Sequence, residues 1–296
     1  MIIDCCITEL ADPRSNTNKV YSLDALILLI FSSVISGYDS IEGMIGFGEL
    51  KQEWLNKFVK LDSLPSPETL RFFLCAINPK ELVKCFEKFI EVNQLNFSGD
   101  CIAIDGKTMR GTDRKNSDAI HMISAWSHEH GVTLTALESK GKKNEIKTIP
   151  DVIDRLSAKD AIISTDAMGC QTEIASKIIE SGNDYMLQLK GNQGKLLEQV
   201  KAYHHKLERE DFQSDRNAIY EEIDKAHGRI EVRKYTQFKL SEWVDKIENW
   251  ERLNTAIKVE RTRIIGDKQT EETSWYISSL EIDAPLAAKS IAPLTI

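Results

Sequence analysis

Apolar positions in the first third of the chain recur at the spacing of helices. Apolar side chains that are three or four positions apart fall on one face of an α-helix. Ser66 is a suitable N-cap for a helix that Pro67 opens, and Pro79 opens another that runs to about Val92. We therefore expect a helical N-terminal domain over residues 1–97. The other predicted helices cover Leu23–Val34, residues 41–47 and residues 51–58.

After residue 100 the pattern changes to short apolar runs that are separated by turn residues and helical segments. Short apolar runs bounded by turns are typical of buried strands. The order is three strands, a helix, a strand, a helix, a strand and a helix, which matches a ribonuclease H-like fold: a mixed sheet with helices on both faces. The predicted strands are 101–105, 121–127, 132–137, 161–166 and 185–190, and the predicted helices are 144–156, 173–180 and 194–207.

A second group of strands follows, so the fold class is α/β with a β-rich insertion. We expect this insertion, about residues 215–280, to form an inserted or appended sheet within a catalytic domain over residues 98–296. Its predicted strands are 218–223, 229–237, 256–265 and 273–280.

Composition places the chain among soluble globular proteins, with 42% apolar and 28% charged residues. The longest apolar stretch, Ala25 to Ile35, is too short to cross a bilayer and predicts a buried helix rather than a membrane anchor. No basic leader precedes it, so no signal peptide is expected. The six cysteines form no Cys-x-x-Cys pair, which favours reduced core thiols and a cytoplasmic protein.

The net charge of −8 argues against a non-specific nucleic-acid binder. Basic residues do gather locally on either side of the predicted strand 121–127. Such groups are either solvated loop faces or DNA contacts, and the sequence leaves both readings open. The groups are Lys107, Arg110, Arg114 and Lys115, then Lys140, Lys142, Lys143 and Lys147.

Two aspartates give the strongest indication of a catalytic site in this sequence. Asp105 ends the first predicted strand and Asp166 ends the fourth, and these two strands are neighbours in a ribonuclease H-like sheet. Two converging carboxylates suit Mg²⁺, a hard cation that prefers oxygen ligands, and a pair of such ions could stabilise the attacking and leaving oxygens of phosphoryl transfer. The alternatives are a plain Asp-Gly turn at Asp105 and a strand-end cap at Asp166.

The stretch from His227 to Arg233 is the next informative one. Alternation along a strand puts Arg229, Glu231 and Arg233 on one face. These residues either form cross-strand ion pairs on a solvated strand, or the arginines hold phosphates while Glu231 approaches the metal. Lys190-Gly191-Asn192 favours an ordinary turn over a site residue, and His204-His205 is expected on the surface, without zinc spacing.

Seven segments along the chain form one ordered set. They are Asp12-Pro13-Arg14, Pro65-Ser66 with Glu68-Thr69, Ile104-Asp105-Gly106-Lys107 with Arg110-Gly111, Thr165-Asp166-Ala167-Met168 with Gln171, Lys190-Gly191-Asn192-Gln193, His227-Gly228-Arg229-Ile230-Glu231 and Trp275-Tyr276-Ile277-Ser278-Ser279-Leu280. Taken together, these segments resemble the H repeat-associated proteins, which are DDE transposases of insertion-sequence type that accompany Rhs elements. The resemblance runs from near the start of the chain to about Leu286.

The resemblance implies a transposase that cuts DNA at element ends with an activated water and joins the freed 3′-hydroxyl to target DNA. It implies Mg²⁺ or Mn²⁺ at Asp105 and Asp166, and double-stranded DNA as the partner. Phosphate contacts are expected at Lys107, Arg110 and Arg229. A homodimer is an open alternative, and no membrane partner is expected.

The chain departs from the family at its C-terminal end. The family's third acid is expected in a stretch of the form Arg-x-His-Trp-x-Ile-Glu-Asn, whereas the chain reads Lys289 to Ile296 without a glutamate. Codons for Ala292-Pro293-Leu294 in a shifted frame can encode His-His-Trp, so we expect a frameshifted copy that lacks the third acid and its helix, and is inactive or impaired. Glu231 is the nearby substitute as metal ligand. The alternative functions are a DNA-binding remnant that inhibits a full-length transposase, and a ribonuclease H-like nuclease.

Overall fold

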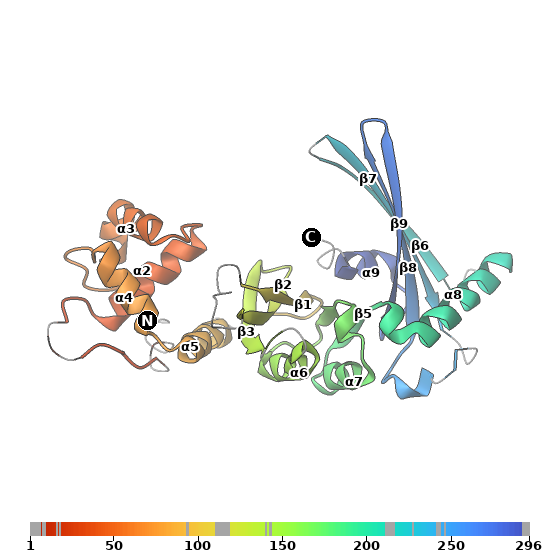
Figure 1. The fold of residues 1–296 in the computed structure, drawn as a ribbon, viewed down its shortest axis with the longest axis horizontal. Helices are drawn as coiled ribbons and strands as arrows, with labels where there is room; N and C mark the ends of the chain where they lie inside the picture. Colours follow the sequence, from red (N-terminus) through yellow and green to blue (C-terminus); the bar gives the residue numbers. More distant parts are fainter. Residues whose placement is uncertain are drawn as a thin grey trace. The chain divides into compact units, whose positions relative to one another are not determined.

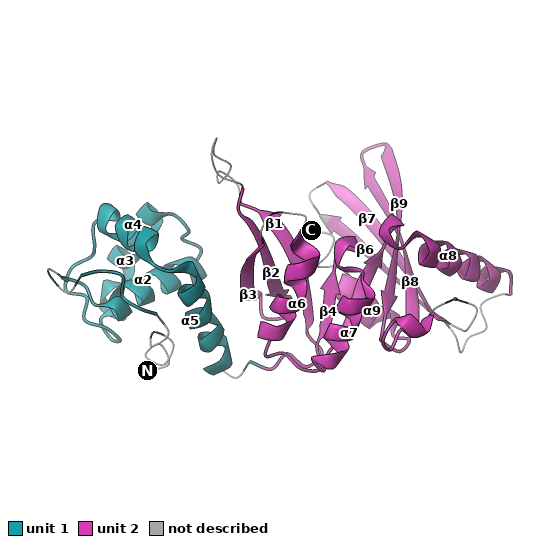
Figure 2. Cartoon of the chain, turned by 60° about the horizontal axis from the view of Figure 1, so that its bottom comes forward, with its two compact units in different colours: residues 1–95 teal, residues 96–296 magenta. Residues whose placement is uncertain are grey.

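The computed structural model divides the chain into two compact units, residues 1–95 and residues 96–296 (Figure 2). None of its described helices is long and apolar enough to cross a membrane. The structure describes residues 7, 10–15, 17, 19–92, 95–109, 119–139, 141, 144–210, 217–226, 228–240, 244–245 and 247–291.

Helices build the first unit, as the apolar spacing predicts. Ser66 accepts a hydrogen bond from Thr69 N and Pro67 is the first helical residue, which confirms the predicted cap. The two short helices predicted over 41–47 and 51–58 are wrong, because a single helix, Ile41–Leu55, covers the first and most of the second. Its polar residues from Glu49 to Glu53 continue the helix on a largely exposed side. The helices are α2 (Leu23–Ile35), α3 (Ile41–Leu55), α4 (Pro67–Ala76) and α5 (Pro79–Val92).

One sheet of nine strands forms the second unit, in the order β3-β2-β1-β4-β5-β9-β8-β7-β6 (Figure 1). Its first five strands have the predicted ribonuclease H-like arrangement, with β4 parallel to both β1 and β5. The strands are β1 (Cys101–Thr108), β2 (His121–Ser127), β3 (Val132–Ser139), β4 (Ile162–Thr165), β5 (Asp184–Leu189), β6 (Asn217–Ala226), β7 (Arg229–Lys239), β8 (Thr255–Ile265) and β9 (Lys268–Ser278).

The β-rich segment extends this sheet instead of forming a separate one. Strand β9 pairs with β5 from Leu189↔Trp275 to Met186↔Ser278, so the last apolar residues of β9 complete the central sheet. The rest of β9, from Lys268 to Ser274, continues past the end of β5 and pairs with β8 alone. The strands β6 to β9 therefore form a blade that is anchored in the central sheet and projects beyond it (Figure 1).

Helices cover both faces of the sheet. Helix α6 packs on β2 and β3, and α7 packs on β5. Helix α8 precedes the blade in the chain. The remaining helix, α9, packs on β6 and β7 as well as on β1, β4 and β5. The four helices are α6 (Glu145–Arg155), α7 (Thr172–Glu180), α8 (Gly194–Arg209) and α9 (Ala284–Ile291).

A helix follows the last strand, and it is not the acid-bearing helix whose absence the sequence predicts. Helix α9 is present, and Ala284, Ala287 and Ile291 are almost wholly buried against the sheet. Cys101 Sγ lies 3.4 Å from Ser290 Oγ, so the end of the helix reaches β1. The sheet face is therefore covered, and no acid is found among the residues of α9.

The expected surface position of the two adjacent histidines holds for one of them. His205 is exposed on α8, but His204 is 1% exposed, with its ring centroid 5.3 Å from that of Trp275 and 5.4 Å from that of Phe238. Burial, the largest effect, lowers the pKa of His204. The surface prediction rested on the charged residues around this pair in the sequence. In the structure, one side of α8 faces aromatic side chains from β7 and β9.

Candidate metal centre on two neighbouring strands

The register of the sheet places Asp105 and Asp166 side by side. Ile104 and Thr165 are partners in the parallel pair β1 and β4, and each aspartate follows directly. Neighbouring strands lie about 4.8 Å apart, so two side chains at this spacing can reach one ion. Both aspartates are exposed.

The two aspartates also belong to the same face of the sheet. Cys101 and Ile162 both pack in the apolar cluster beneath α9. Each aspartate stands four residues further along its strand, and side chains separated by an even number of positions point to one face. The carboxylates therefore lie on the α9 side of the sheet. Asp166 directly follows β4, whereas β1 continues past Asp105, its predicted end, to Thr108.

Asp166 is held by the loop that it opens. Its Oδ1 accepts hydrogen bonds from Met168 N at 3.0 Å and from Gly169 N at 3.4 Å, which caps the short 3-10 helix η2 (Ala167–Gly169). The side chain of Asn192 braces the same loop, because its Nδ2 donates to Ala167 O at 2.6 Å. The sequence favours a plain turn at Lys190-Gly191-Asn192, and the structure adds a supporting role for its asparagine.

Replacing Asn192 by alanine should loosen the loop after Asp166. A hydrogen bond of this kind contributes about 1 kcal/mol, so the free energy of unfolding should fall by about that amount. Amide hydrogen exchange at Met168 and Gly169 should become faster, as measured by mass spectrometry or NMR. Asn249→Ala, an exposed change in the 3-10 helix η4 (Ile247–Asn249), is the matched control. Unchanged exchange in Asn192→Ala would contradict the bracing role.

The two aspartates supply part of the oxygen ligands that a hard divalent cation needs. Both groups are oxygen ligands, and within the described residues Asp105 has no hydrogen-bond or ion-pair partner that would compete for its carboxylate. The buried Ser164 Oγ, two positions before Asp166, also has no partner in that part of the chain. Among the described residues, the single group of three candidate metal ligands within 4.8 Å of one another is His204, His205 and Glu208 on α8, so no third ligand joins the aspartates.

The basic residues predicted to contact phosphates are dispersed. Lys107 is exposed on β1, two positions after Asp105 and on the same face. Arg110 lies outside the described residues. Arg229 begins β7, and three strands separate β7 from β4 in the sheet. Of these residues, the structure therefore brings Lys107 to the aspartates and leaves Arg229 at the blade.

Glu231 is not brought to the aspartates either. It lies on β7 in the projecting part of the blade and is 2% exposed. Its carboxylate pairs with Arg233 beside it on β7, with Arg261 at 3.3 Å and with Arg263 at 3.2 Å. Burial acts most strongly and raises the pKa of Glu231, but the hydrogen bonds and charges of these arginines together lower it. The structure thus shows the ion-pair alternative for this stretch, with Glu231 bound by three arginines.

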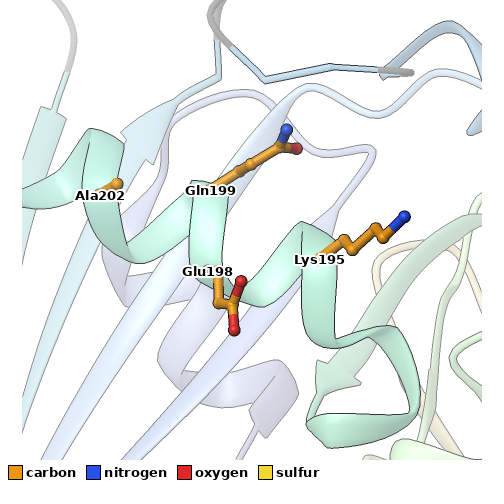
Figure 3. A pocket seen from close by; sticks show the side chains of 4 residues that line it. All are labelled: Lys195, Glu198, Gln199 and Ala202. Carbon is orange, nitrogen blue, oxygen red and sulfur yellow. The ribbon is translucent and has the colours of Figure 1, made fainter.

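A surface hollow lies along α8, away from the two aspartates. Its volume is about 450 Å³, and its lining residues come from one side of the helix (Figure 3). They are Lys195, Glu198, Gln199 and Ala202, and they include neither aspartate.

Comparison with known proteins identifies the two parts of the chain. Residues 5–90 match the family described as DDE_Tnp_1-associated, and residues 96–286 match the transposase DDE domain. The H repeat-associated putative transposase YhhI of Escherichia coli K12 is 32% identical over 293 residues, which cover 96% of this chain and 77% of YhhI. The putative transposase YncI of Escherichia coli O157:H7 is 34% identical over 294 residues, covering 96% of this chain and 74% of YncI.

A relative from another genus has almost the same length of match. A protein named from the dhlA 3′ region of Xanthobacter autotrophicus is 33% identical over 280 residues, which cover 92% of both chains. These matches agree with the order of the first five strands and with the neighbouring aspartates on β1 and after β4. The chain belongs to the DDE transposase family, and it is similar to its H repeat-associated members.

Proposed function

We propose that Asp105 and Asp166 form the metal-binding part of an active site that cuts DNA and joins it to a target. The observation that carries the proposal is the pairing of Ile104 with Thr165, which sets the following carboxylates side by side. DDE transposases generally use a divalent metal and act on DNA, which supports Mg²⁺ or Mn²⁺ and double-stranded DNA here. When bound, the metal would stabilise charge on the phosphate oxygens.

The proposed reaction has two steps at phosphorus. Water attacks the phosphorus at an element end, the bond from phosphorus to O3′ breaks, and a free 3′-hydroxyl remains. That hydroxyl then attacks a phosphorus of the target, forming a new P–O3′ bond while the target's own O3′ leaves. Asp105 and Asp166 would bind the metal, and Lys107 on the same face would neutralise a neighbouring phosphate. Arg229, on the blade, would contact DNA further from the reacting phosphorus, and Arg110 stays a predicted phosphate contact.

The small number of metal ligands among the described residues favours a second candidate function. Within the described residues no third carboxylate joins the pair, and two aspartates alone hold a metal weakly. A chain with this site could bind element ends without cutting them and so inhibit an intact transposase.

The test uses the full chain, Mn²⁺ and a duplex that carries the DNA flanking its gene. Products in which a 3′ end is joined to a second duplex would support the transposase. Cuts without joining would support a nuclease of the same fold. End-specific binding that produces no cuts and survives Asp105→Asn and Asp166→Asn would support the inhibitor. Cutting that survives both substitutions would contradict the proposed site.

A further inference from the structure

A buried histidine–glutamate pair lies beside the proposed metal centre. His121 begins β2 and is 3% exposed, and Glu145 is in the first turn of α6 and is 7% exposed. His121 Nε2 donates a hydrogen bond to Glu145 Oε1. The other ring nitrogen, Nδ1, lies 3.0 Å from Oγ1 of Thr108, the partner of His121 in the ladder of β1 and β2. Three side chains thus tie the end of β1 to β2 and to α6.

The pair closes directly over Gly106, the residue after Asp105. A Cβ atom at Gly106 would lie 2.6 Å from Glu145 Oε1 and 2.9 Å from His121 Nε2, closer than real Cβ contacts. Glycine at this position therefore lets the polar pair rest on the backbone of β1. Since side chains alternate along a strand, the pair occupies the α6 side of the sheet while Asp105 points to the α9 side.

Asp105 depends on this backbone more than Asp166 does. Asp166 is fixed by two amide groups of its own loop. Asp105 has no such bonds to described residues, so its direction follows from the strand alone. On one side of it Ile104 is 2% exposed and packed in the core. On the other side Gly106 is held by the histidine–glutamate pair.

Stability alone does not explain why two polar side chains are buried at this place. Replacing a buried ion pair by apolar side chains of similar volume is often neutral or stabilising, because desolvation offsets the attraction of the charges. A polar pair does supply directional bonds, and here the bonded side chains lie against Gly106, the residue next to a proposed metal ligand. We infer that His121 and Glu145 are positioning residues that hold the Asp105–Gly106 backbone so that the Asp105 carboxylate faces the ion. The inference rests on the proposed function of the two aspartates.

The test measures Mn²⁺ affinity of the full chain by electron paramagnetic resonance, well below the melting temperature of each variant. Supporting partners around metal ligands typically affect affinity 10- to 100-fold, so Glu145→Gln should weaken Mn²⁺ binding by about tenfold or more. Gly106→Ala, which would push the pair off the backbone, should do the same. The double change His121→Phe with Glu145→Leu fills the space with apolar groups, and it should keep the melting temperature while losing affinity.

Asp100→Asn is the matched control for stability. Asp100 is 1% exposed and accepts hydrogen bonds from Ser127 Oγ and Glu129 N, so it is an equally buried carboxylate that joins β1 to β2. It stands five positions before Asp105, about 17 Å along the strand. This variant should lower the melting temperature and leave Mn²⁺ affinity unchanged.

The outcomes separate this inference from the proposed function. Loss of affinity in the pair variants, but not in Asp100→Asn, would support positioning. Unchanged affinity in the folded double variant would overturn the inference and leave the metal centre in place. If the parent chain binds no Mn²⁺ through Asp105 and Asp166, both proposals fail together.

Discussion

Replacing Glu231 by glutamine is expected to destabilise the second unit by about 3–5 kcal/mol, the usual result of removing one partner from a buried ion pair. Glu231 is 2% exposed and is the shared partner of Arg233, Arg261 and Arg263. Without its charge the three guanidinium groups would face one another across the ladder of β7 and β8. Denaturant unfolding at neutral pH measures the loss.

The control for this prediction is Glu272→Gln. Glu272 also pairs with Arg261, at 3.6 Å, but its side chain is 66% exposed, and exposed pairs contribute about 1 kcal/mol or less. A loss for Glu231→Gln no larger than that for Glu272→Gln would show that the arginine cluster does not depend on its central carboxylate.

The stability difference between the parent chain and Glu231→Gln should depend on pH. The arginines lower the pKa of Glu231 from its usual 4.5, so its stabilisation is fully present above that pH and is lost as the pH falls through the folded pKa. The difference in unfolding free energy between the parent and Glu231→Gln should therefore shrink below about pH 4.5. A constant difference between pH 7 and pH 3.5 would contradict an ionised, stabilising Glu231.

The second large effect is expected at the two aspartates. Asp105→Asn and Asp166→Asn each remove one of two carboxylates and should abolish measurable Mn²⁺ binding. Lewis-acid stabilisation amounts to several kcal/mol and each 1.4 kcal/mol changes a rate tenfold, so any Mn²⁺-dependent cutting should fall by about 10³-fold or more. Both side chains are exposed, so the melting temperature should hardly change. Metal titration, a cleavage assay and thermal unfolding are measured on the same samples.

Asp184→Asn is a suitable control for these variants. Asp184 stands at the start of β5, at the opposite end of the strands, where its Oδ1 accepts a hydrogen bond from Ser279 Oγ. This change should affect stability and leave metal binding intact. Equal loss of Mn²⁺ binding in Asp184→Asn would mean that a general effect of charge, rather than a site at Asp105 and Asp166, holds the metal.

Local patterns were sufficient to predict the central sheet. The apolar runs that end at Asp105 and Asp166 are buried strands, and the turn at His130-Gly131 joins β2 to β3 as the sequence indicates, with Gly131 at a positive φ of 63°. Strand type and order then place the aspartates together, because the parallel pairing of β1 and β4 follows from the ribonuclease H-like arrangement. The position of the candidate site is thus encoded in short segments.

Those local patterns could not predict contacts between segments that lie far apart in the sequence. Whether Glu231 meets a metal or arginines depends on which residues of β8 stand opposite, and Arg261 and Arg263 are set there by the β7–β8 register. His204 is buried because β7 and β9 bring Phe238 and Trp275 to α8. The continuation of the central sheet into the blade likewise depends on the pairing of β5 with β9, which neither strand reveals alone.

Helix α9 has a mechanical consequence for how the second unit unfolds. The central strands and the blade share one short seam, the pairing of β5 with β9. Helix α9 lies across both sides of that seam, since it packs on β1, β4 and β5 and also on β6 and β7. If the seam opened, α9 would lose its packing partners on one side, and that part of its apolar face would become exposed to water. The helix therefore couples the two halves of the sheet into one cooperative folding unit, and its loss would leave two halves able to melt separately.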